Sequence, residues 1–281
     1  MIEGIKLIQG QKDPVLARYR RLFRPAGRHA EQAYAIEGRE LLSRAPRYGA
    51  AMEATLWTDT FLKSDEGRAA YAAIRAACPE VPHFQLKSGL LARATSTRPL
   101  PPCVGIARRP RSSIDEVLRG ESPLVVAIDR GENGDNLGML LRSAEAAGVS
   151  GVLLGAGSAD PFGRRVIRAA RGAVFHLPIA EVESLSETLV NAKERGFTVY
   201  GSSAKVEAAY HEVSLTGPTI LMVGNEHHGL SPECLACADE NLKIPMAGQI
   251  HSLNIAVAAS ILLFEARRQR ASQIPTARGD Q

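Results

Sequence analysis

Three groups of polar residues in the second half of the chain could carry chemistry, because each lies beside a strongly apolar segment. They lie in DNLGMLLRSAEAAGV (135–149), LMVGNEHHGL (221–230) and IPMAGQIHSLNIAVAASILLFE (244–265). Each group stands where a strand is expected to pass into a loop or a helix. In open α/β sheets this edge is where ligands bind. The three groups together therefore predict one binding site.

The first group offers an amide and a guanidinium. Asn136 is well placed to cap the helix that follows it. On that helix, the stripe expected to face a sheet consists of Leu137, Leu140, Leu141, Ala144 and Gly148. Arg142 projects from the opposite side, where it could bind an anion or pair with Glu145 at the surface. The segment by itself favours the surface role.

The second group combines a glycine with a carboxylate. Gly224 follows an apolar run, and a glycine at a strand end lets the backbone approach a ligand closely. Glu226 could face that ligand or cap the helix that follows Ser231. His227 and His228 are adjacent, but no further clustered ligands accompany them, so we predict no metal site.

The third group lies at the start of the last helix. Ser252 is a natural N-cap there, whereas Asn254 has no such simple role. The stripe expected to pack firmly against the core consists of Leu253, Val257, Ser260, Ile261 and Phe264.

The elements that must position these residues are expected to form two domains, because 281 residues exceed the usual size of about 150 residues for one domain. A polar stretch at 108–122 separates residues 1–107 from residues 123–270, and 271–281 is a polar tail. The first domain alternates short helices and strands, which indicates a small α/β or α+β unit.

In the second domain, strands alternate regularly with helices. The expected strands are Leu124–Asp129, Gly151–Leu154, Val174–Pro178, Phe197–Gly201, Thr219–Gly224 and Asn241–Ile244. The expected helices cover 137–147, 162–170, 184–195, 231–237 and 252–270. This alternation predicts a mainly parallel sheet covered on both faces.

Bulk composition excludes several classes of protein. No apolar run reaches the roughly 20 residues of a membrane span, and no signal peptide is evident, which predicts a cytoplasmic protein without a membrane partner. Four cysteines do not make a disulfide framework. Cys234 and Cys237 are expected to be buried on one helix. The pair Gly155 and Gly157 lacks the third glycine of the dinucleotide fingerprint, which argues against a nicotinamide-dependent oxidoreductase.

The net charge of +4 is mildly basic, but arginines are concentrated in a few places. These arginine clusters lie at 18–28, at 108–111 and at 164–171. The guanidinium fork binds phosphate bidentately, so several clusters with few lysines favour phosphate contact. Arg164, Arg168 and Arg171 recur at helical spacing and would share one face if a helix extends that far.

The spelling and order of the three groups resemble the motifs of the SpoU (TrmH-like) RNA ribose methyltransferases of the SPOUT superfamily. The patterns are N-L-G-x-x-x-R-S-A, then G-N-E-x-x-G-L-S, then I-P-M-x-G-x-x-x-S-L-N. The resemblance covers residues 123–270. Residues 1–107 look more loosely like the L30e-like substrate-binding domain of that family, with Y-A-I-E-G at 34–38.

The resemblance implies a trefoil-knotted SPOUT-type α/β fold, S-adenosylmethionine as cofactor, and a homodimer whose active site uses both subunits. The residues that it places around the reaction are Asn136, Arg142, Glu226, Ser252 and Asn254. The residues that it places around the cofactor are Leu221, Val223, Gly224, Asn225, Glu226, Ile244, Pro245, Met246, Ser252 and Leu253. Two positions depart from the family pattern, which usually has proline at Gly134 and often serine at Ala256.

The implied reaction is methyl transfer to a ribose 2′-hydroxyl of structured RNA, with ribosomal RNA favoured over transfer RNA. Arg142 is a poor base because a guanidinium stays protonated in water near neutral pH. Binding an RNA phosphate is therefore its favoured role, although the resemblance also allows a base role. The residues expected to contact the RNA backbone are Arg18, Arg28, Arg164, Arg168 and Arg171. The alternative is a non-catalytic RNA-binding protein that retains the fold.

Overall fold

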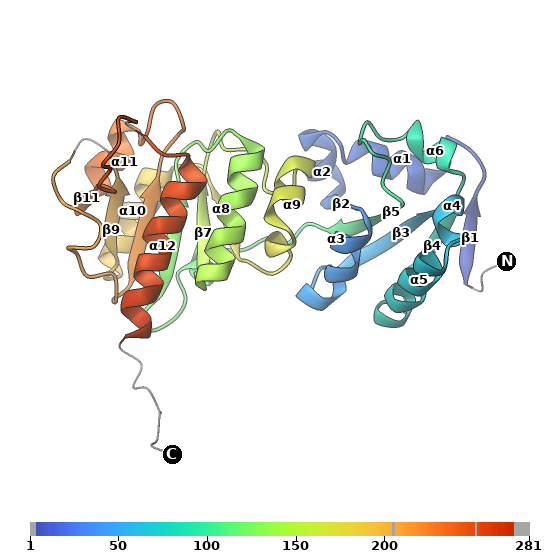
Figure 1. Cartoon of the computed structure of the whole chain (residues 1–281), viewed down its shortest axis with the longest axis horizontal. Helices are drawn as coiled ribbons and strands as arrows, with labels where there is room; N and C mark the ends of the chain where they lie inside the picture. Colours follow the sequence, from blue (N-terminus) through green and yellow to red (C-terminus); the bar gives the residue numbers. More distant parts are fainter. Residues whose placement is uncertain (1–3, 204–205, 251, 273–281) are drawn as a thin grey trace, which may run out of the picture. The chain divides into compact units, whose positions relative to one another are not determined.

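The computed structural model describes residues 4–203, 206–250 and 252–272, and these residues fold into two compact units (Figure 1). Unit 1 consists of the chain up to Pro110 together with Asp160–His176. Unit 2 consists of Arg111–Ala159 and the chain from Leu177 onward. The chain therefore leaves unit 1, returns to it, and leaves it again.

Unit 2 is built on a six-stranded sheet in which every pairing is parallel, in the order β11-β9-β10-β6-β7-β8. Its strands are β6 (Leu124–Ile128), β7 (Gly151–Gly155), β8 (Ile179–Val182), β9 (Thr198–Ser202), β10 (Thr219–Val223) and β11 (Glu240–Leu242). Its helices are α7 (Ile114–Val117), α8 (Gly134–Ala147), α10 (Leu185–Glu194), α11 (Pro232–Cys237) and α12 (Ile255–Ala271). The prediction of an α/β fold with a mainly parallel sheet is confirmed.

Helices cover both faces of this sheet, which explains why β6, β7 and β10 are apolar and buried along their whole length. Alternate residues of β6 and β10, such as Val125 and Met222, pack in one cluster with Leu189 of α10 and Cys234 of α11. The other face lies under α8 and α12, which pack side by side (Figure 1). Cys234 and Cys237 are both buried on α11, as predicted.

Unit 1 contains a five-stranded mixed sheet in the order β1-β4-β3-β5-β2, in which β5 runs antiparallel to both of its neighbours. Its strands are β1 (Ile5–Ile8), β2 (Ala33–Glu37), β3 (Met52–Thr58), β4 (His83–Leu86) and β5 (Cys103–Arg108). Its helices are α1 (Pro14–Arg21), α2 (Pro25–Glu31), α3 (Arg39–Arg44), η1 (Pro46–Tyr48), α4 (Asp59–Leu62), α5 (Asp65–Ala77), α6 (Ser88–Ala92), α9 (Arg164–Ala170) and η2 (Ala173–Phe175).

The two faces of the unit 1 sheet carry separate cores. Leu56 packs with α1 and α6 on one face, whereas its neighbour Trp57 packs with α3 and α5 on the other. Successive residues of a strand point to opposite faces, so β3 divides its side chains between the two cores. Figure 1 shows α1 and α6 on one side of the sheet and α3 and α5 on the other.

Residues 160–176 belong to unit 1 because their aromatic side chains pack against it and Asp160 pairs with its arginines. The rings of Phe162 and Phe175 pack against Tyr34, at centroid distances of 5.1 and 6.3 Å. Asp160 accepts a 2.6 Å hydrogen bond from the buried Arg28 and also pairs with Arg109. These contacts anchor a segment that lies between β7 and β8 in the chain.

Two sequence-based expectations differ from the structure. The strand predicted at Val174–Pro178 is wrong, because 173–175 forms the 3₁₀ helix η2 within unit 1 and β8 begins only at Ile179. The expected linker 108–122 contains α7, whose Val117 is fully buried in the core of unit 2. The expected tail 271–281 lies outside the described residues from 273 onward. Among the described helices, none is long and apolar enough to cross a membrane.

Candidate active site

A cavity of about 420 Å³ opens in unit 2 at the carboxyl ends of β9 and β10. Its walls come from the segment that follows β10, from the segment that follows β11, and from the start of α12. The lining residues are Ser202, Ser203, Val223, Gly224, Asn225, Glu226, His227, His228, Gly229, Leu230, Leu235, Leu242, Ile244, Met246, Ser252, Leu253, Ile255 and Ala258. The volume falls in the range of small-molecule sites.

A chain of hydrogen bonds connects the three polar groups beside this cavity. The Nδ2 of Asn254 donates to the Oδ1 of Asn136 at 2.9 Å, and the Nδ2 of Asn136 donates to the Oε1 of Glu226 at 2.9 Å. The Oδ1 of the same Asn254 amide accepts from the backbone N–H of Ala256 at 2.9 Å. Both side-chain amides are therefore fixed in orientation, and one carboxylate oxygen of Glu226 is held in place.

The N-caps of α8 and α12 lie within three residues of the positions expected, but at different residues. Asn133 caps α8 and accepts from the N–H groups of Asp135 and Asn136, so the side chain of Asn136 is free for Glu226. Asn254 caps α12, whereas Ser252 lies outside the helix, exposed on the cavity wall. The capping roles predicted for Asn136 and Ser252 are therefore wrong.

The two departures from the family pattern are both accommodated. Gly134 occupies the first position of α8, where proline is favoured only because its missing N–H is not needed. The backbone N–H of Ala256 reaches Asn254 without any contribution from its own side chain, which is 4% exposed. Neither substitution removes a hydrogen bond from the chain that joins the three groups.

The loop after β10 is held in one shape by buried polar groups. Asn225 is 5% exposed, and its Oδ1 accepts from the N–H groups of His227 and His228 while its Nδ2 donates to the carbonyl of Arg130. Its backbone exchanges two 2.9 Å hydrogen bonds with Gly229, which adopts a positive φ of 69°. The Asn225 side chain thus stabilises the loop rather than offering groups to a ligand.

Gly224 is required by close packing at the start of this loop. A Cβ at that position would lie 2.1 Å from the carbonyl carbon of Gly229 and 2.2 Å from the backbone nitrogen of Leu230. Asp129, at the end of β6, fixes the end of the loop by accepting a 2.6 Å hydrogen bond from the N–H of Ser231. Sequence reasoning missed Asp129, although its place at a strand end is the same signal that identified the other groups.

Most residues predicted to surround a cofactor line the cavity, with Leu221 and Pro245 as the exceptions. Leu221 is 2% exposed within the sheet, because it lies two residues before the end of β10. Sequence reasoning missed Ser202 and Ser203. Ser202 is the last residue of β9, the strand next to β10, and Ser203 follows it, so the strand-end rule could have found them.

His227 and His228 are exposed at the cavity and belong to no metal-binding cluster. Within the described ranges, no group of three His, Cys, Asp or Glu side chains could hold a metal ion.

Arg142 does not line the cavity. It is exposed on α8, and among the described residues it has no hydrogen bond or ion pair. The face of α8 that carries Leu137, Leu140, Leu141 and Ala144 is buried as predicted, although Gly148, predicted with them, is exposed. The chain therefore brings Asn136, Glu226 and Asn254 together beside the cavity, with Ser252 in its wall, and leaves Arg142 outside.

The apolar stripe predicted to pack α12 against the core is the exposed face of that helix. Leu253, Val257 and Phe264 are 39%, 49% and 49% exposed. The buried face is instead formed by Ile255, Ala256, Ala259, Leu262, Leu263 and Ala266. Ser260 Oγ donates to Ser143 Oγ at 2.7 Å, which joins α12 to α8. The two helices leave an uncovered apolar surface that also includes Met139, 44% exposed.

At least four of the five arginines predicted to contact RNA form ion pairs within unit 1. Arg18 bridges Glu31 and Glu53, Arg164 pairs with Glu37, and Arg171 pairs with Glu40. Arg28 is 4% exposed against Asp160. The fifth, Arg168, is exposed on α9, which ends at Ala170 before reaching Arg171.

Comparisons with known proteins agree on one family. The model of the SpoU rRNA methylase family matches residues 123–264. The 23S rRNA (guanosine(2553)-2′-O)-methyltransferase RlmP of Bacillus subtilis is 28% identical over 264 residues, which is 94% of this chain and the whole of that protein. The 23S rRNA (guanosine-2′-O-)-methyltransferase RlmB of Vibrio parahaemolyticus is 35% identical over 57% of this chain and 65% of that protein.

Solved structures give the same answer along almost the entire chain. An AdoMet-bound rRNA methyltransferase from Sinorhizobium meliloti superposes with a TM-score of 0.81 at 27% identity, over 94% of this chain and 98% of that one. An RNA 2′-O ribose methyltransferase superposes with a TM-score of 0.78 at 31% identity, over 95% of this chain and 100% of that one.

Proposed function

Because this chain belongs to the SpoU rRNA methylase family, we propose that it transfers a methyl group to a ribose 2′-hydroxyl of structured ribosomal RNA. The observation that carries the proposal is the hydrogen-bonded chain from Asn254 through Asn136 to Glu226 beside the cavity. A protein that merely bound RNA would not need this chain beside a cavity sized for a small molecule. The relatives named above methylate 23S ribosomal RNA, which favours that substrate over transfer RNA.

The cavity fits S-adenosylmethionine in size and in chemistry. Apolar side chains, among them Leu230, Leu242 and Ile244, offer a surface for an adenine ring, and the hydroxyls of Ser202 and Ser252 and the Glu226 carboxylate offer polar partners. Gly224 lets the loop after β10 close tightly against Gly229 and Leu230, which sets the shape of this wall of the cavity. When bound, the cofactor supplies a methyl group activated by its sulfonium.

The residues of the chain then have to orient the acceptor ribose. Asn136 and Asn254 are preorganised amides, so they can hydrogen-bond a hydroxyl without further loss of side-chain freedom. Glu226 is fixed by Asn136 through one carboxylate oxygen and lines the cavity. Arg142 is assigned to an RNA phosphate rather than to proton removal, since a guanidinium stays protonated near neutral pH.

The position of Arg142 supports a dimeric active site. It lies on α8 three residues beyond Met139, which belongs to the uncovered apolar surface of α8 and α12. A second copy of the chain that packs on this surface would bury Val257 and Phe264 and would bring its own Arg142 near the interface. We assign the apolar surface to a homodimer. The trefoil knot of the family stays a prediction.

Unit 1 is assigned the role of holding the RNA, as expected for an L30e-like domain. The cytoplasm is the proposed place of action, because the relatives named above are bacterial enzymes that methylate ribosomal RNA.

The test of the proposed function is a methylation assay on a 23S rRNA transcript, with 2′-O-methylated nucleotides mapped with and without the protein and its cofactor. The proposal requires at least one new 2′-O-methyl group that depends on both. Methylation of a base, or RNA binding with no methylation, would overturn it.

A further inference from the structure

The charges of unit 1 are not distributed as the sequence suggests, because four of its clustered arginines are already neutralised. Arg18, Arg28, Arg164 and Arg171 each pair with an acidic side chain of the same unit. A phosphate that approached one of these arginines would have to compete with a carboxylate already in contact. The cations that can bind a polyanion most favourably are therefore the exposed ones without such a partner.

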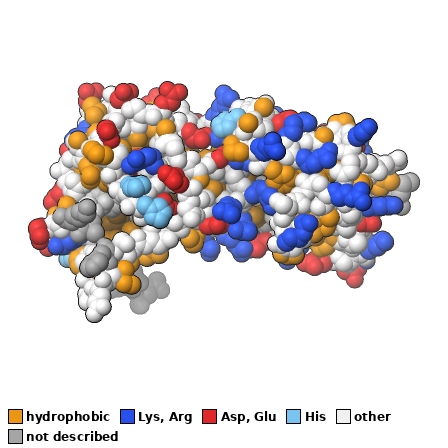
Figure 2. Space-filling view, turned by 90° about the horizontal axis from the view of Figure 1, so that it is seen from above, with side chains coloured by type: hydrophobic (Ala, Val, Ile, Leu, Met, Phe, Trp, Pro, Cys, Tyr) orange, Lys and Arg blue, Asp and Glu red, His pale blue; other side chains and the backbone are white. Residues whose placement is uncertain are grey.

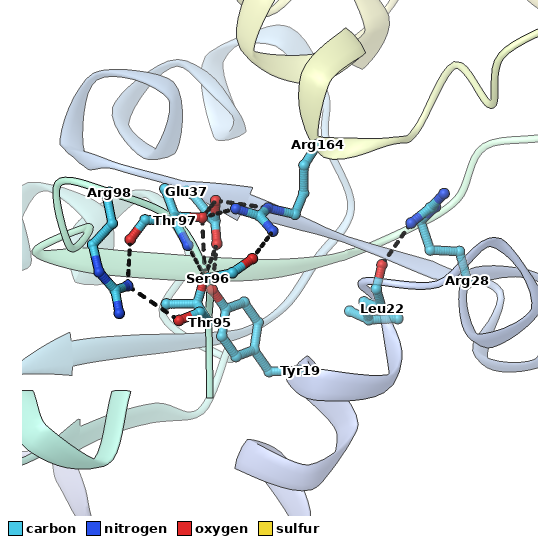
Figure 3. A network of polar contacts seen from close by, with 9 residues as sticks. All are labelled: Tyr19, Leu22, Arg28, Glu37, Thr95, Ser96, Thr97, Arg98 and Arg164. Carbon is cyan, nitrogen blue, oxygen red and sulfur yellow. Dashed lines mark hydrogen bonds and ion pairs between the residues drawn. The ribbon is translucent and has the colours of Figure 1, made fainter. Parts of the chain in front are cut away.

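One loop of unit 1, Thr95–Arg98, is held by a network that converges on Glu37 (Figure 3). The carboxylate of Glu37 accepts hydrogen bonds from Tyr19 at 2.5 Å, from Thr95 at 3.2 Å and from Thr97 at 2.7 Å. Arg164 lies over the same loop, where it pairs with Glu37 at 3.1 Å and donates to the hydroxyls of Ser96 and Thr97. The loop is thereby fixed in shape.

The ends of the loop carry cations that pair with no acid among the described residues. Arg98 donates to the carbonyls of Thr95 and Thr97, which are uncharged partners, and its side chain points away from Glu37 (Figure 3). Arg93 is exposed two residues before the loop, at the end of α6. In the part of the chain that the structure describes, Arg93 has no ion pair.

Further cations lie on α1, just after α1 and at the start of α9. Arg164 stacks on the ring of Phe23 at 4.5 Å, which brings the exposed neighbours Arg24 and Arg165 close to the loop. Arg20 donates to the neutral Gln11, which in turn donates to the carbonyl of Leu90 on α6. Figure 2 shows Lys and Arg side chains gathered on this face of unit 1 with few Asp or Glu between them.

We propose that unit 1 grips the phosphate backbone of structured RNA with this surface, here called the loop-95 surface. It is formed by Arg20, Arg24, Arg93, Arg98 and Arg165. The inference deepens the proposed function and rests on it. The fixed loop presents its charges and the Ser96 hydroxyl without an ordering cost. Contacts of this kind recognise the spacing of phosphates and hence RNA shape, not base identity.

The experiment measures binding of a 23S rRNA transcript to the full chain by filter binding at several salt concentrations. The test variant is Arg93→Glu with Arg98→Glu. The control is Arg47→Glu with Lys63→Glu, two exposed residues next to α3 and α5 on the opposite face of the unit 1 sheet, so that both proteins change in net charge equally. All four positions are on the surface, so the fold should survive, and thermal unfolding checks this.

The test variant should bind RNA at least about tenfold more weakly, and the slope of log affinity against log salt should be smaller by about one for each phosphate that the variant no longer neutralises. The control should stay within about twofold of the parent protein. Cofactor binding, measured by calorimetry, should be the same in all three. An equal decrease in test and control, or unchanged binding by the test variant, would overturn the loop-95 surface. Failure of the proposed function is seen separately, as a parent protein that binds this RNA but does not methylate it.

Discussion

Asn254 donates a hydrogen bond to Asn136 across 118 residues of sequence, and the 2.9 Å contact joins the first turn of α12 to the first turn of α8. The same side chain caps α12 through its oxygen. One amide thus serves both the helix and the candidate active site, and substitutions can separate the two roles.

Replacing Asn254 with Ser should keep the cap and lose the bond to Asn136, whereas replacement with Ala should lose both. We expect Asn254→Ala to lower the free energy of unfolding by about 1 kcal/mol and Asn254→Ser to lower it by only a few tenths. Both should reduce the methyl-transfer rate to a similar extent. Urea unfolding and initial rates measure the two effects, and activity that followed stability across the pair would contradict a positioning role.

Arg142→Ala should retain cofactor binding and lose methyl transfer. The side chain is exposed and lies outside the cavity wall, so its removal leaves the lining intact. Calorimetry with S-adenosylmethionine and a methylation assay together test this. Cofactor binding abolished in a folded Arg142→Ala protein would show that the assignment to the RNA phosphate is wrong.

Gly224→Ala should damage the cavity, because the added methyl group would lie 2.1 Å from the backbone of Gly229. The loop after β10 would have to move, and we expect cofactor affinity to fall at least about tenfold, the equivalent of about 1.4 kcal/mol. Gly248→Ala is the matched control, since a Cβ at Gly248 meets no atom within 4 Å. Equal affinities in the two variants would argue against close packing at Gly224.

Val257→Lys should convert a dimer into monomers, because it places a charge in the apolar surface of α8 and α12. Val190→Lys on α10 is the control: Val190 is 48% exposed and Val257 49%, but Val190 lies on the other face of the sheet. Analytical ultracentrifugation gives the oligomeric state. A dimer that survived Val257→Lys with unchanged affinity would place the interface elsewhere.

Unit 1 should lose stability as the pH falls below about 6.5. Burial, with the nearby charge of Arg75, holds the pKa of His83 below its ordinary value. As the pH falls, His83 of the unfolded chain therefore takes up a proton before His83 of the folded chain does. The contribution of His83 to stability is full above the pKa of the unfolded chain and is lost as the pH falls. Urea unfolding at pH 7.5 and 5.5 should show this drop, and His83→Asn should reduce it. An identical pH dependence in the variant would exclude His83 as its source.

The sequence predicted the parallel sheet and the edge of the sheet where the site lies, because runs such as Leu124–Ile128 and Thr219–Val223 are apolar throughout. It misassigned the stripe of α12, since that helix is apolar on two faces and periodicity does not say which face meets the core. The caps were misplaced because Asn and Ser are both favoured N-cap residues, and each helix start offers two of them a few residues apart: Asn133 and Asn136 for α8, and Ser252 and Asn254 for α12.

The other failures concern contacts between distant parts of the chain. Nothing in the local pattern of 160–176 reveals that Tyr34 and Arg28 provide its partners. The same limit applies to the arginines, because a cluster in sequence does not show which of its charges already have an acidic neighbour. The hydrogen bond between Asn136 and Glu226 likewise spans 90 residues.

The membership of Asp160–His176 in unit 1 bears on how such proteins can gain or lose a domain. A gene rearrangement that removed only residues before Arg111 would leave behind Phe162 and Phe175 without the Tyr34 ring, and Asp160 without Arg28. A family member that lacks the first domain should therefore also have a different sequence in the connection between β7 and β8. Gain or loss of the first domain therefore requires changes in two segments of the gene, the one before Arg111 and the one that encodes Asp160–His176. These two segments should vary together among relatives.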